Sequence, residues 1–351
     1  MNALQQRARG ALLGLAIGDA IGWPAMFHRS HVLPPWTRRL RREIDGQRED
    51  TGVLRIPMPF SLNQPAETFE LGPTDDTEWA AWTISTLMDH GCTVDEKWVT
   101  EAWVGLARQQ ERVKGGVSTQ AALENLRRGL LPPSSGRDNP HYFDDGAACR
   151  AVPIGIAYAG KPETAASAAA IEASVTNFED GVWIAAAIAG AISAACAGES
   201  AEAVISVALK VLPKKSWTLR TVERALVLAR GQNSPLGLVS RLDSIVSKEY
   251  SDGCVGPESL ALSLAVIQDC AGGFDGAVAA AALFARSADA VPGIVGAIAG
   301  ALSPEAETIQ QWSHWSMQGI CLPQLAGVDY LQLVNEYVGT CPSLQAREGI
   351  S

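Results

Sequence analysis

The chain has 351 residues, of which 47% are hydrophobic, so it is long enough to bury a large core. Its formal net charge is −10, and its basic residues are scattered apart from the short cluster at 38–42. Because an acidic protein repels phosphate backbones at long range, these features argue against nucleic acid as a partner.

The amino-terminal segment lacks the pattern of an export signal. Its apolar run from Gly10 is ended early by Asp19, and no small-residue cleavage site precedes that aspartate. The most apolar windows, 182–197 and 291–302, are shorter than the about 20 residues of a membrane span, so they predict buried helices. The seven cysteines include no C-x-x-C pair, which favours reduced thiols in a cytoplasmic protein.

Helical periodicity extends over most of the chain, whereas alternating β-branched runs bounded by turns are nearly absent. The helical windows lie at 11–18, 76–90, 97–110, 118–129, 146–159, 164–174, 181–197, 201–212, 219–230, 235–247, 257–271, 274–286, 291–302 and near 328–338. The sequence therefore predicts an all-α fold, with one domain over residues 1–351. The proline-rich stretch 23–73 is predicted as a long irregular loop, and such loops are usually functional or lid-like.

The stretch Gly72–Trp79 carries two adjacent carboxylates, Asp75 and Asp76, flanked by hydroxyls and followed by an apolar helical run. Thr74 or Asp75 can cap that helix, and Asp75 with Glu78 fits a capping box. One carboxylate is enough for a cap, however, whereas Mg²⁺ requires several oxygen ligands. These residues alone leave both interpretations open, a helix cap and a cation site.

Five segments, in this order along the chain, resemble the motifs of the ADP-ribosylglycohydrolase family, which includes the dinitrogenase-reductase-activating glycohydrolases. They are 10–22 (GALLGLAIGDAIG), 74–77 (TDDT), 145–155 (DGAACRAVPIG), 174–177 (SVTN) and 288–301 (ADAVPGIVGAIAGA). The resemblance covers roughly residues 8–315. It implies a compact orthogonal multi-helix bundle of the ADP-ribosylglycohydrolase type.

The resemblance also implies a metal centre, typically of two Mg²⁺ or Mn²⁺ ions, that binds a ribosyl group while its C1 bond is hydrolysed. Thr74, Asp75 and Asp76 match the family's amino-terminal metal triplet, and Asp289 matches its carboxy-terminal aspartate. Such a hydrolysis passes through an oxocarbenium-like state, and a metal can hold the ribose hydroxyls and acidify a water. A nearby carboxylate takes the proton, so Asp75 and Asp76 are also the catalytic candidates.

The chain departs from the family pattern at three metal-ligand positions. The family's D-x-D-T/S run is Ser287–Ala290 here, so the first aspartate and the hydroxyl are missing. Met26 stands where the family often has a glutamate that helps to hold a metal. Because these losses fall mainly on one of the two metal positions, we expect one Mg²⁺ or Mn²⁺ ion per chain.

The substrate-binding candidates are Asp145, Gly146, Ala147, Arg150 and Asn177. In better-known members of the family, the corresponding loops help to hold the ADP-ribose diphosphate. Asp145 replaces the family's asparagine, and Asn177 replaces its histidine. Because an added carboxylate is unfavourable beside phosphates, a smaller ribosyl or N-glycosidic substrate becomes plausible. Arg150 fits a buried ion pair as well as it fits an anion ligand.

Three further features have more than one interpretation. Asp19 either hydrogen-bonds to the metal ligands without contacting the metal, or hydrogen-bonds a helix terminus. Asp144 either lines a cleft or forms a turn before a helix. Trp23, Trp36 and Trp79 can stack on a base or sugar, although core packing explains each of them alone.

The sequence thus predicts a metal-dependent hydrolase of a ribosyl or ADP-ribosyl N- or O-glycosidic bond. The expected partner is a small ribosyl or ADP-ribosyl compound or a modified protein, without nucleic acid or membrane. The alternative is a catalytically silent homologue that binds a nucleotide or sugar, or a regulatory factor that occludes an ADP-ribosyltransferase. The retained ligands at 74–76 and 289 favour the enzyme, and the losses at 26, 287 and 290 favour the binding protein.

Overall fold

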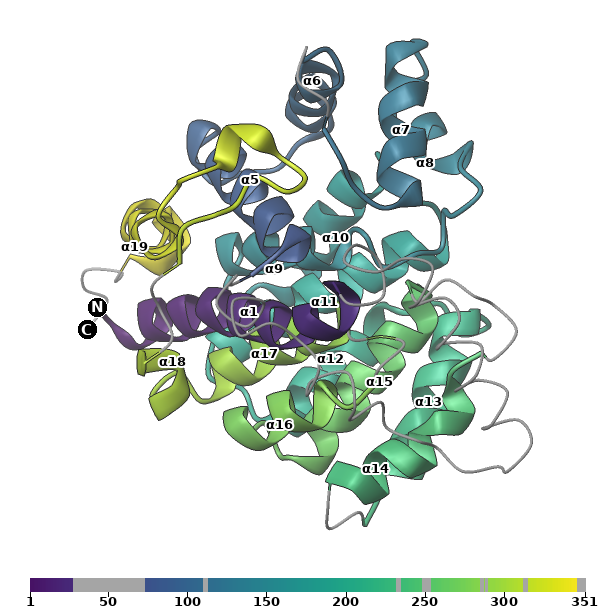
Figure 1. Cartoon of the computed structure of the whole chain (residues 1–351), viewed down its shortest axis with the longest axis vertical. Coiled ribbons are helices and arrows are strands. Elements are labelled where there is room, and N and C mark those ends of the chain that lie inside the picture. Colours follow the sequence, from purple (N-terminus) through teal and green to yellow (C-terminus); the bar gives the residue numbers. More distant parts are fainter. Residues whose placement is uncertain are drawn as a thin grey trace.

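The computed structural model describes residues 1–27, 73–109, 113–231, 235–247, 254–284, 287, 290–311 and 315–345, except for the side chains of 23–27 and 236. These residues form helices joined by turns and loops (Figure 1). They contain no β-sheet, only two isolated bridges, Asp144–Val255 and Ser316–Asp329. The predicted all-α fold is therefore confirmed.

The helices are α1 (Ala3–Phe27), α5 (Asp75–Asp89), α6 (Glu96–Ala107), α7 (Val117–Arg127), α8 (Ser134–Arg137), α9 (Ala148–Ala157), α10 (Pro162–Ala173), α11 (Asp180–Cys196), α12 (Ala201–Val211), α13 (Trp217–Ala229), α14 (Pro235–Leu242), α15 (Gly256–Asp269), α16 (Phe274–Ala281), α17 (Ala290–Leu302), α18 (Glu307–Gln311) and α19 (Tyr330–Thr340). Three short 3₁₀ turns, η2 (Asp243–Ile245), η3 (Pro323–Leu325) and η4 (Pro342–Leu344), complete the described elements. Most helices lie within a few residues of their predicted windows.

Helix α1 is longer than predicted. It runs from Ala3 to Phe27, whereas the sequence predicts a helix over 11–18 and an irregular chain from residue 23. The remainder of that predicted loop, 28–72, lies outside the described residues. The glycines that break the apolar pattern of α1 have a packing role.

Helices α1 and α17 pack backbone against backbone, and α1 crosses the molecule beside α17 in Figure 1. The contacting pairs are Gly10 with Gly300, Gly14 with Gly296 and Gly18 with Pro292. A β-carbon on any of the three α1 glycines would collide with a carbonyl oxygen of α17. Because only glycine lacks that carbon, this close approach requires glycine at these positions. The packing sets the start of α17 beside residues 18–19 of α1.

We predict that replacing Gly296 by alanine destabilises the protein. The new methyl group would collide with the carbonyl oxygen of Gly14, and overpacking of this kind costs about 1–3 kcal/mol or more. Gly105 in α6 is the matched control, because nothing lies within 4 Å of the position that a β-carbon would take there and alanine favours helix. Urea unfolding should show a lower free energy for Gly296→Ala and an equal or higher one for Gly105→Ala. Equal stabilities in both variants would contradict the close packing.

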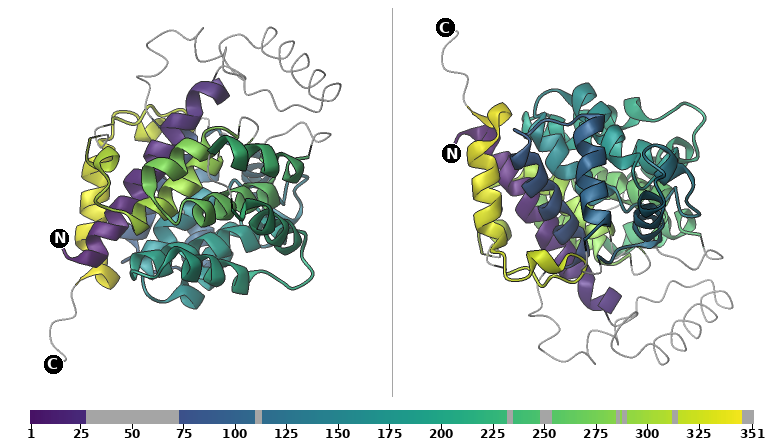
Figure 2. Two further views of the ribbon diagram at one scale, coloured as in Figure 1. Left: turned by 90° about the horizontal axis from the view of Figure 1, so that it is seen from below. Right: turned by 90° about the horizontal axis from the view of Figure 1, so that it is seen from above.

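The carboxy-terminal helix α19 packs against α1 and α5. Figure 2 shows it beside the amino-terminal part of α1. The Tyr330 hydroxyl donates to the Leu12 carbonyl at 3.0 Å, and the Tyr337 hydroxyl donates to the Pro153 carbonyl at 2.7 Å. Both tyrosines are fully buried. The end of the described chain is thereby fastened to α1 and α9.

The most apolar helices, α11 and α17, are buried inside the protein, as predicted. Among the described residues, no helix is both long and apolar enough to cross a membrane. The seven cysteines all lie within the described residues as reduced thiols, and five of them are buried.

Candidate active site

Asp19 caps helix α5 from another helix. Its buried carboxylate accepts hydrogen bonds from the Thr74 amide at 2.7 Å and the Thr77 amide at 3.0 Å. It also accepts the Thr74 hydroxyl at 2.5 Å and the Thr77 hydroxyl at 2.6 Å. These amides belong to the start of α5, where backbone donors lack partners within the helix. Asp19 therefore fixes the first turn of α5, as the helix-terminus interpretation expects, and two of its four hydrogen bonds come from Thr74, a predicted ligand.

Thr74 occupies the N-cap position of α5, but its side chain does not cap the helix. Its hydroxyl turns instead to Asp19, and its Oγ1 lies 3.2 Å from an Asp75 carboxylate oxygen. The predicted capping box is also wrong, because its glutamate has other partners. Glu78 is fully buried and accepts the amides of residues 320, 321 and 322 at 2.6, 2.7 and 3.1 Å. Glu78 thus holds a carboxy-terminal loop rather than its own helix start.

Asp75 and Asp76 are half-buried in the first turn of α5. A carboxylate oxygen of Asp76 lies 3.6 Å from the position that a β-carbon on Gly293 would take, so Asp76 faces the first turn of α17. The Cys149 thiol, in the first turn of α9, donates to the Gly146 carbonyl at 3.9 Å and lies within range of the Asp76 charge. Burial, and then the charge of Asp76, raise the pKa of Cys149 well above its ordinary value. These contacts bring the starts of α5, α9 and α17 together.

The loop before α9 is held by a buried carboxylate, that of Asp144. It accepts the Gly146 amide at 3.1 Å and the Asn177 side-chain amide at 2.9 Å, and one of its oxygens lies 4.0 Å from the position that a β-carbon on Gly116 would take. Ser118 lies in the first turn of α7, whose N-cap residue, Gly116, has no side chain to cap it. Burial raises the pKa of Asp144, and these hydrogen bonds oppose that rise. Asp144 therefore forms the predicted turn and lies beside the start of α7.

Asp145, Gly146 and Ala147 lie together in this loop, close to the start of α5. The buried Asp145 carboxylate accepts the Ser259 hydroxyl of α15 at 2.5 Å. Gly146 is closely surrounded, because a β-carbon there would lie 3.1 Å from the Ser118 hydroxyl oxygen and 3.2 Å from an Asp144 oxygen. Ala147 is buried at the N-cap position of α9.

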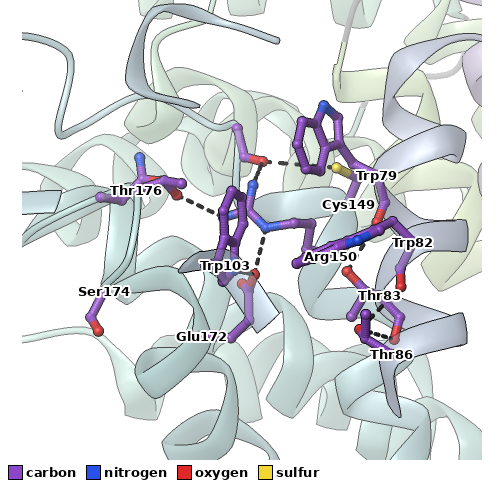
Figure 3. Close-up of polar contacts among 12 residues, drawn as sticks. Trp79, Trp82, Thr83, Thr86, Trp103, Cys149, Arg150, Glu172, Ser174 and Thr176 are labelled. Carbon is purple, nitrogen blue, oxygen red and sulfur yellow. Dashed lines mark hydrogen bonds and ion pairs between the residues drawn. The ribbon is translucent and has the colours of Figure 1, made fainter. Parts of the chain in front are cut away.

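Arg150 and Asn177 point into the protein. The fully buried guanidinium of Arg150 donates to Glu172 at 2.7 Å, to the Gly146 carbonyl at 2.6 Å and to the Thr176 hydroxyl at 2.7 Å. Figure 3 shows Arg150 between Glu172 and Thr176. Its guanidinium carbon lies 4.9 Å from the centroid of the Trp103 ring. The geometry favours the buried ion pair over the anion ligand. Asn177, also fully buried, donates to the Tyr142 and Asp144 carbonyls as well as to the Asp144 carboxylate.

Trp79 belongs to the core rather than to an exposed stacking surface. Its ring stacks on Trp103 at a centroid distance of 5.5 Å and meets Trp82 edge-on at 5.8 Å. It is only 3% exposed, so the packing interpretation holds for this tryptophan. Trp36 and the side chain of Trp23 lie outside the described residues.

Part of the predicted metal centre lies outside the described residues. Asp289 directly precedes Ala290, the first residue of α17, but is itself not described, and neither is the side chain of Met26. In the described part of the chain, no three His, Cys, Asp or Glu side chains converge as a metal site. The described ligand candidates are Thr74, Asp75 and Asp76 alone. Sequence reasoning missed two residues that hold the predicted ones in place, Glu172 and Ser259, because no local motif marks them.

Asp19 should make stability depend on pH. Burial, followed by the Asp75 charge, raises the pKa of Asp19 to about 6, against its hydrogen bonds from Thr74 and Thr77. The folded protein therefore binds the proton of the Asp19 carboxyl more tightly than the unfolded chain does. This raises the free energy of unfolding by its full amount below about pH 4, and the gain is lost as the pH rises through 6. The loss should reach about 2–3 kcal/mol in metal-free protein. Urea unfolding at pH 4, 5, 6 and 7.5 should show this fall for the wild type and not for Asp19→Asn; parallel curves would contradict it.

The sequence model of the ADP-ribosylglycohydrolase family matches residues 1–339. Because this match covers nearly the whole chain, the chain belongs to the ADP-ribosylglycohydrolase family. Membership supports a glycosyl hydrolase of that type and confirms the resemblance found in the motifs.

A solved structure of an "ADP-ribosylglycohydrolase-related protein complex" is similar to this chain, with a TM-score of 0.61 and 18% sequence identity. The likeness covers 98% of this chain and 100% of that chain. At such low identity it shows the fold alone, which is the expected multi-helix bundle. No curated protein matches the sequence.

Proposed function

We propose that the protein is a metal-dependent hydrolase of a ribosyl N- or O-glycosidic bond. The observation that carries this proposal is the first turn of α5, where Thr74, Asp75 and Asp76 are adjacent and Asp19 anchors the turn through four hydrogen bonds. If Asp75 and Asp76 formed only an acidic helix start, the buried Asp19 carboxylate would not be needed to hold that turn in place. This arrangement supports a site in which oxygen atoms are held ready for a cation.

The residues present fit one Mg²⁺ or Mn²⁺ ion. The Thr74 hydroxyl donates a hydrogen bond to Asp19 at 2.5 Å, so the lone pairs of its oxygen could bind the metal ion. The carboxylates of Asp75 and Asp76 are the oxygen donors that such hard cations prefer, and Asp289 is the expected fourth ligand. A bound ion would supply a Lewis acid for the ribose hydroxyls and for the attacking water.

Stabilisation of the transition state and proton transfer from water would depend on the chain's own side chains. The negative charges of Asp75 and Asp76 favour the positive charge that develops on the ribose ring in an oxocarbenium-like state. One of these carboxylates takes the proton of the attacking water. Asp19 and Glu78 keep the turn in place, because each fastens α5 to a different part of the chain. The reduced thiols support the cytoplasm as the compartment.

The test is release of free sugar or ADP-ribose from a panel of ribosyl compounds with Mg²⁺ or Mn²⁺ and again with EDTA. The panel includes ADP-ribosyl-arginine, ADP-ribosyl-serine, nucleosides and NAD. We expect turnover of at least one compound that stops when EDTA is added. Silence across the panel, in protein that binds ADP-ribose or a nucleoside by calorimetry, would instead identify a binding protein.

A further inference from the structure

The region around Asp76 is rich in carboxylates. Asp75 and Asp76 begin α5, which packs against α9. The loop that leads into α9 carries Asp144 and Asp145, which are also buried. Four carboxyl groups therefore belong to two adjacent helix starts.

Helix starts are the usual protein sites for phosphate, because their amides and dipoles favour negative charge. Here, the chain's own carboxylates take that place. Asp144 accepts the Gly146 amide just before α9, and Asp19 accepts the Thr74 and Thr77 amides at the start of α5. A phosphate would have to displace a covalently held carboxylate at either position.

The polar groups that could hold a phosphate beside this loop are also engaged. All three guanidinium nitrogens of Arg150 donate within the protein, and its charge is paired with Glu172. The side-chain amide of Asn177 donates to Asp144 and to the Tyr142 carbonyl. If the Arg150 guanidinium or the Asn177 amide turned to bind a phosphate, a buried acceptor would lose its hydrogen-bond partner, which is unfavourable.

We propose that the ribosyl compound that this site takes carries no phosphate. This inference rests on the proposed ribosyl hydrolase function and narrows its substrate class. A neutral or cationic riboside meets the carboxylates without repulsion, whereas a phosphate or diphosphate adds like charges beside Asp144 and Asp145. Asp145 is then a specificity residue that selects against phosphorylated compounds.

A matched series tests this directly: nicotinamide riboside, nicotinamide mononucleotide and NAD, in both anomeric forms, with Mn²⁺. The scissile bond and leaving group are constant, whereas the number of phosphates increases along the series. We expect kcat/KM for the riboside to exceed that for NAD by about tenfold or more. Asp145→Asn keeps an oxygen for the Ser259 hydroxyl but removes a charge, and should lower this preference about tenfold.

The control is Asp95→Asn, which removes one charge from an exposed N-cap of α6 and should leave the preference unchanged. Calorimetry with ribose and ribose 5-phosphate gives the same comparison without turnover. Equal or better use of NAD, tighter binding of ribose 5-phosphate, or a preference that survives Asp145→Asn would overturn the inference. A preference for ribose without any turnover of the series or the wider panel would support the inference and contradict the hydrolase function.

Discussion

Asp76→Asn should lower kcat/KM on any ribosyl substrate by about 10²–10³-fold, the scale expected when one electrostatic stabiliser of a transition state is removed. Asparagine has nearly the same shape, so the turn of α5 should stay folded. The charge that faces the first turn of α17 would be lost, however. The measurement is sugar release at saturating Mn²⁺, together with Mn²⁺ affinity by calorimetry.

Asp89→Asn is the matched control for this prediction, because Asp89 ends the same helix on an exposed surface. It should leave both activity and metal affinity within about twofold of the wild type, as is usual for a surface change. If Asp76→Asn kept full Mn²⁺ affinity and full turnover, Asp76 would be only part of an acidic helix start. That is the other interpretation that the sequence leaves open.

Arg150→Met should destabilise the protein by about 3–5 kcal/mol, because it leaves the buried Glu172 carboxylate without its positive partner. Glu172 also accepts the Trp103 ring N–H at 3.1 Å, so the arginine, the glutamate and the stacked tryptophans form one buried unit. Urea unfolding measures the loss. A change below about 1 kcal/mol, which is typical of exposed ion pairs, would contradict this role.

The double variant Arg150→Met/Glu172→Gln provides the control. Glutamine keeps an oxygen for the Trp103 N–H but carries no charge, so the double variant should be more stable than Arg150→Met alone. Arg150→Lys distinguishes a structural role of Arg150 from ligand binding. Lysine keeps the charge but cannot replace the three hydrogen bonds that the planar guanidinium donates. A loss of stability is expected from it. A higher KM with unchanged stability would instead identify Arg150 as an anion ligand.

The helical class and most helix positions could be predicted because apolar spacing reports directly on which helix faces are buried. The length of α1 could not. The predicted helix covers only 11–18, because Asp19 ends the apolar run and a proline-rich stretch begins at Trp23. Gly10, Gly14 and Gly18 give no support to a longer helix in a single sequence, since glycine is a poor helix former. Their use becomes visible only when the α17 backbone lies against them.

The site could be predicted in part, by family motifs rather than by spacing. The motifs indicate residues 74–76 and 145–150, and the packing of α5 against α9 brings these segments together. Their supports could not be read from the sequence, because the partners are far apart along the chain. Asp19 lies 55 residues from Thr74, and Glu78 lies 243 residues from Cys321, whose amide it accepts in the carboxy-terminal loop.

The central claim is that one metal ion held at the start of α5 is required for glycosidic hydrolysis. The most direct measurement titrates metal-free protein with Mn²⁺ while following free Mn²⁺ by electron paramagnetic resonance and sugar release in the same samples. We predict that binding and activity rise together and saturate at one equivalent per chain, and that Asp76→Asn loses both. Full activity in protein stripped of metal, or activity that rises without stoichiometric binding, would contradict the account.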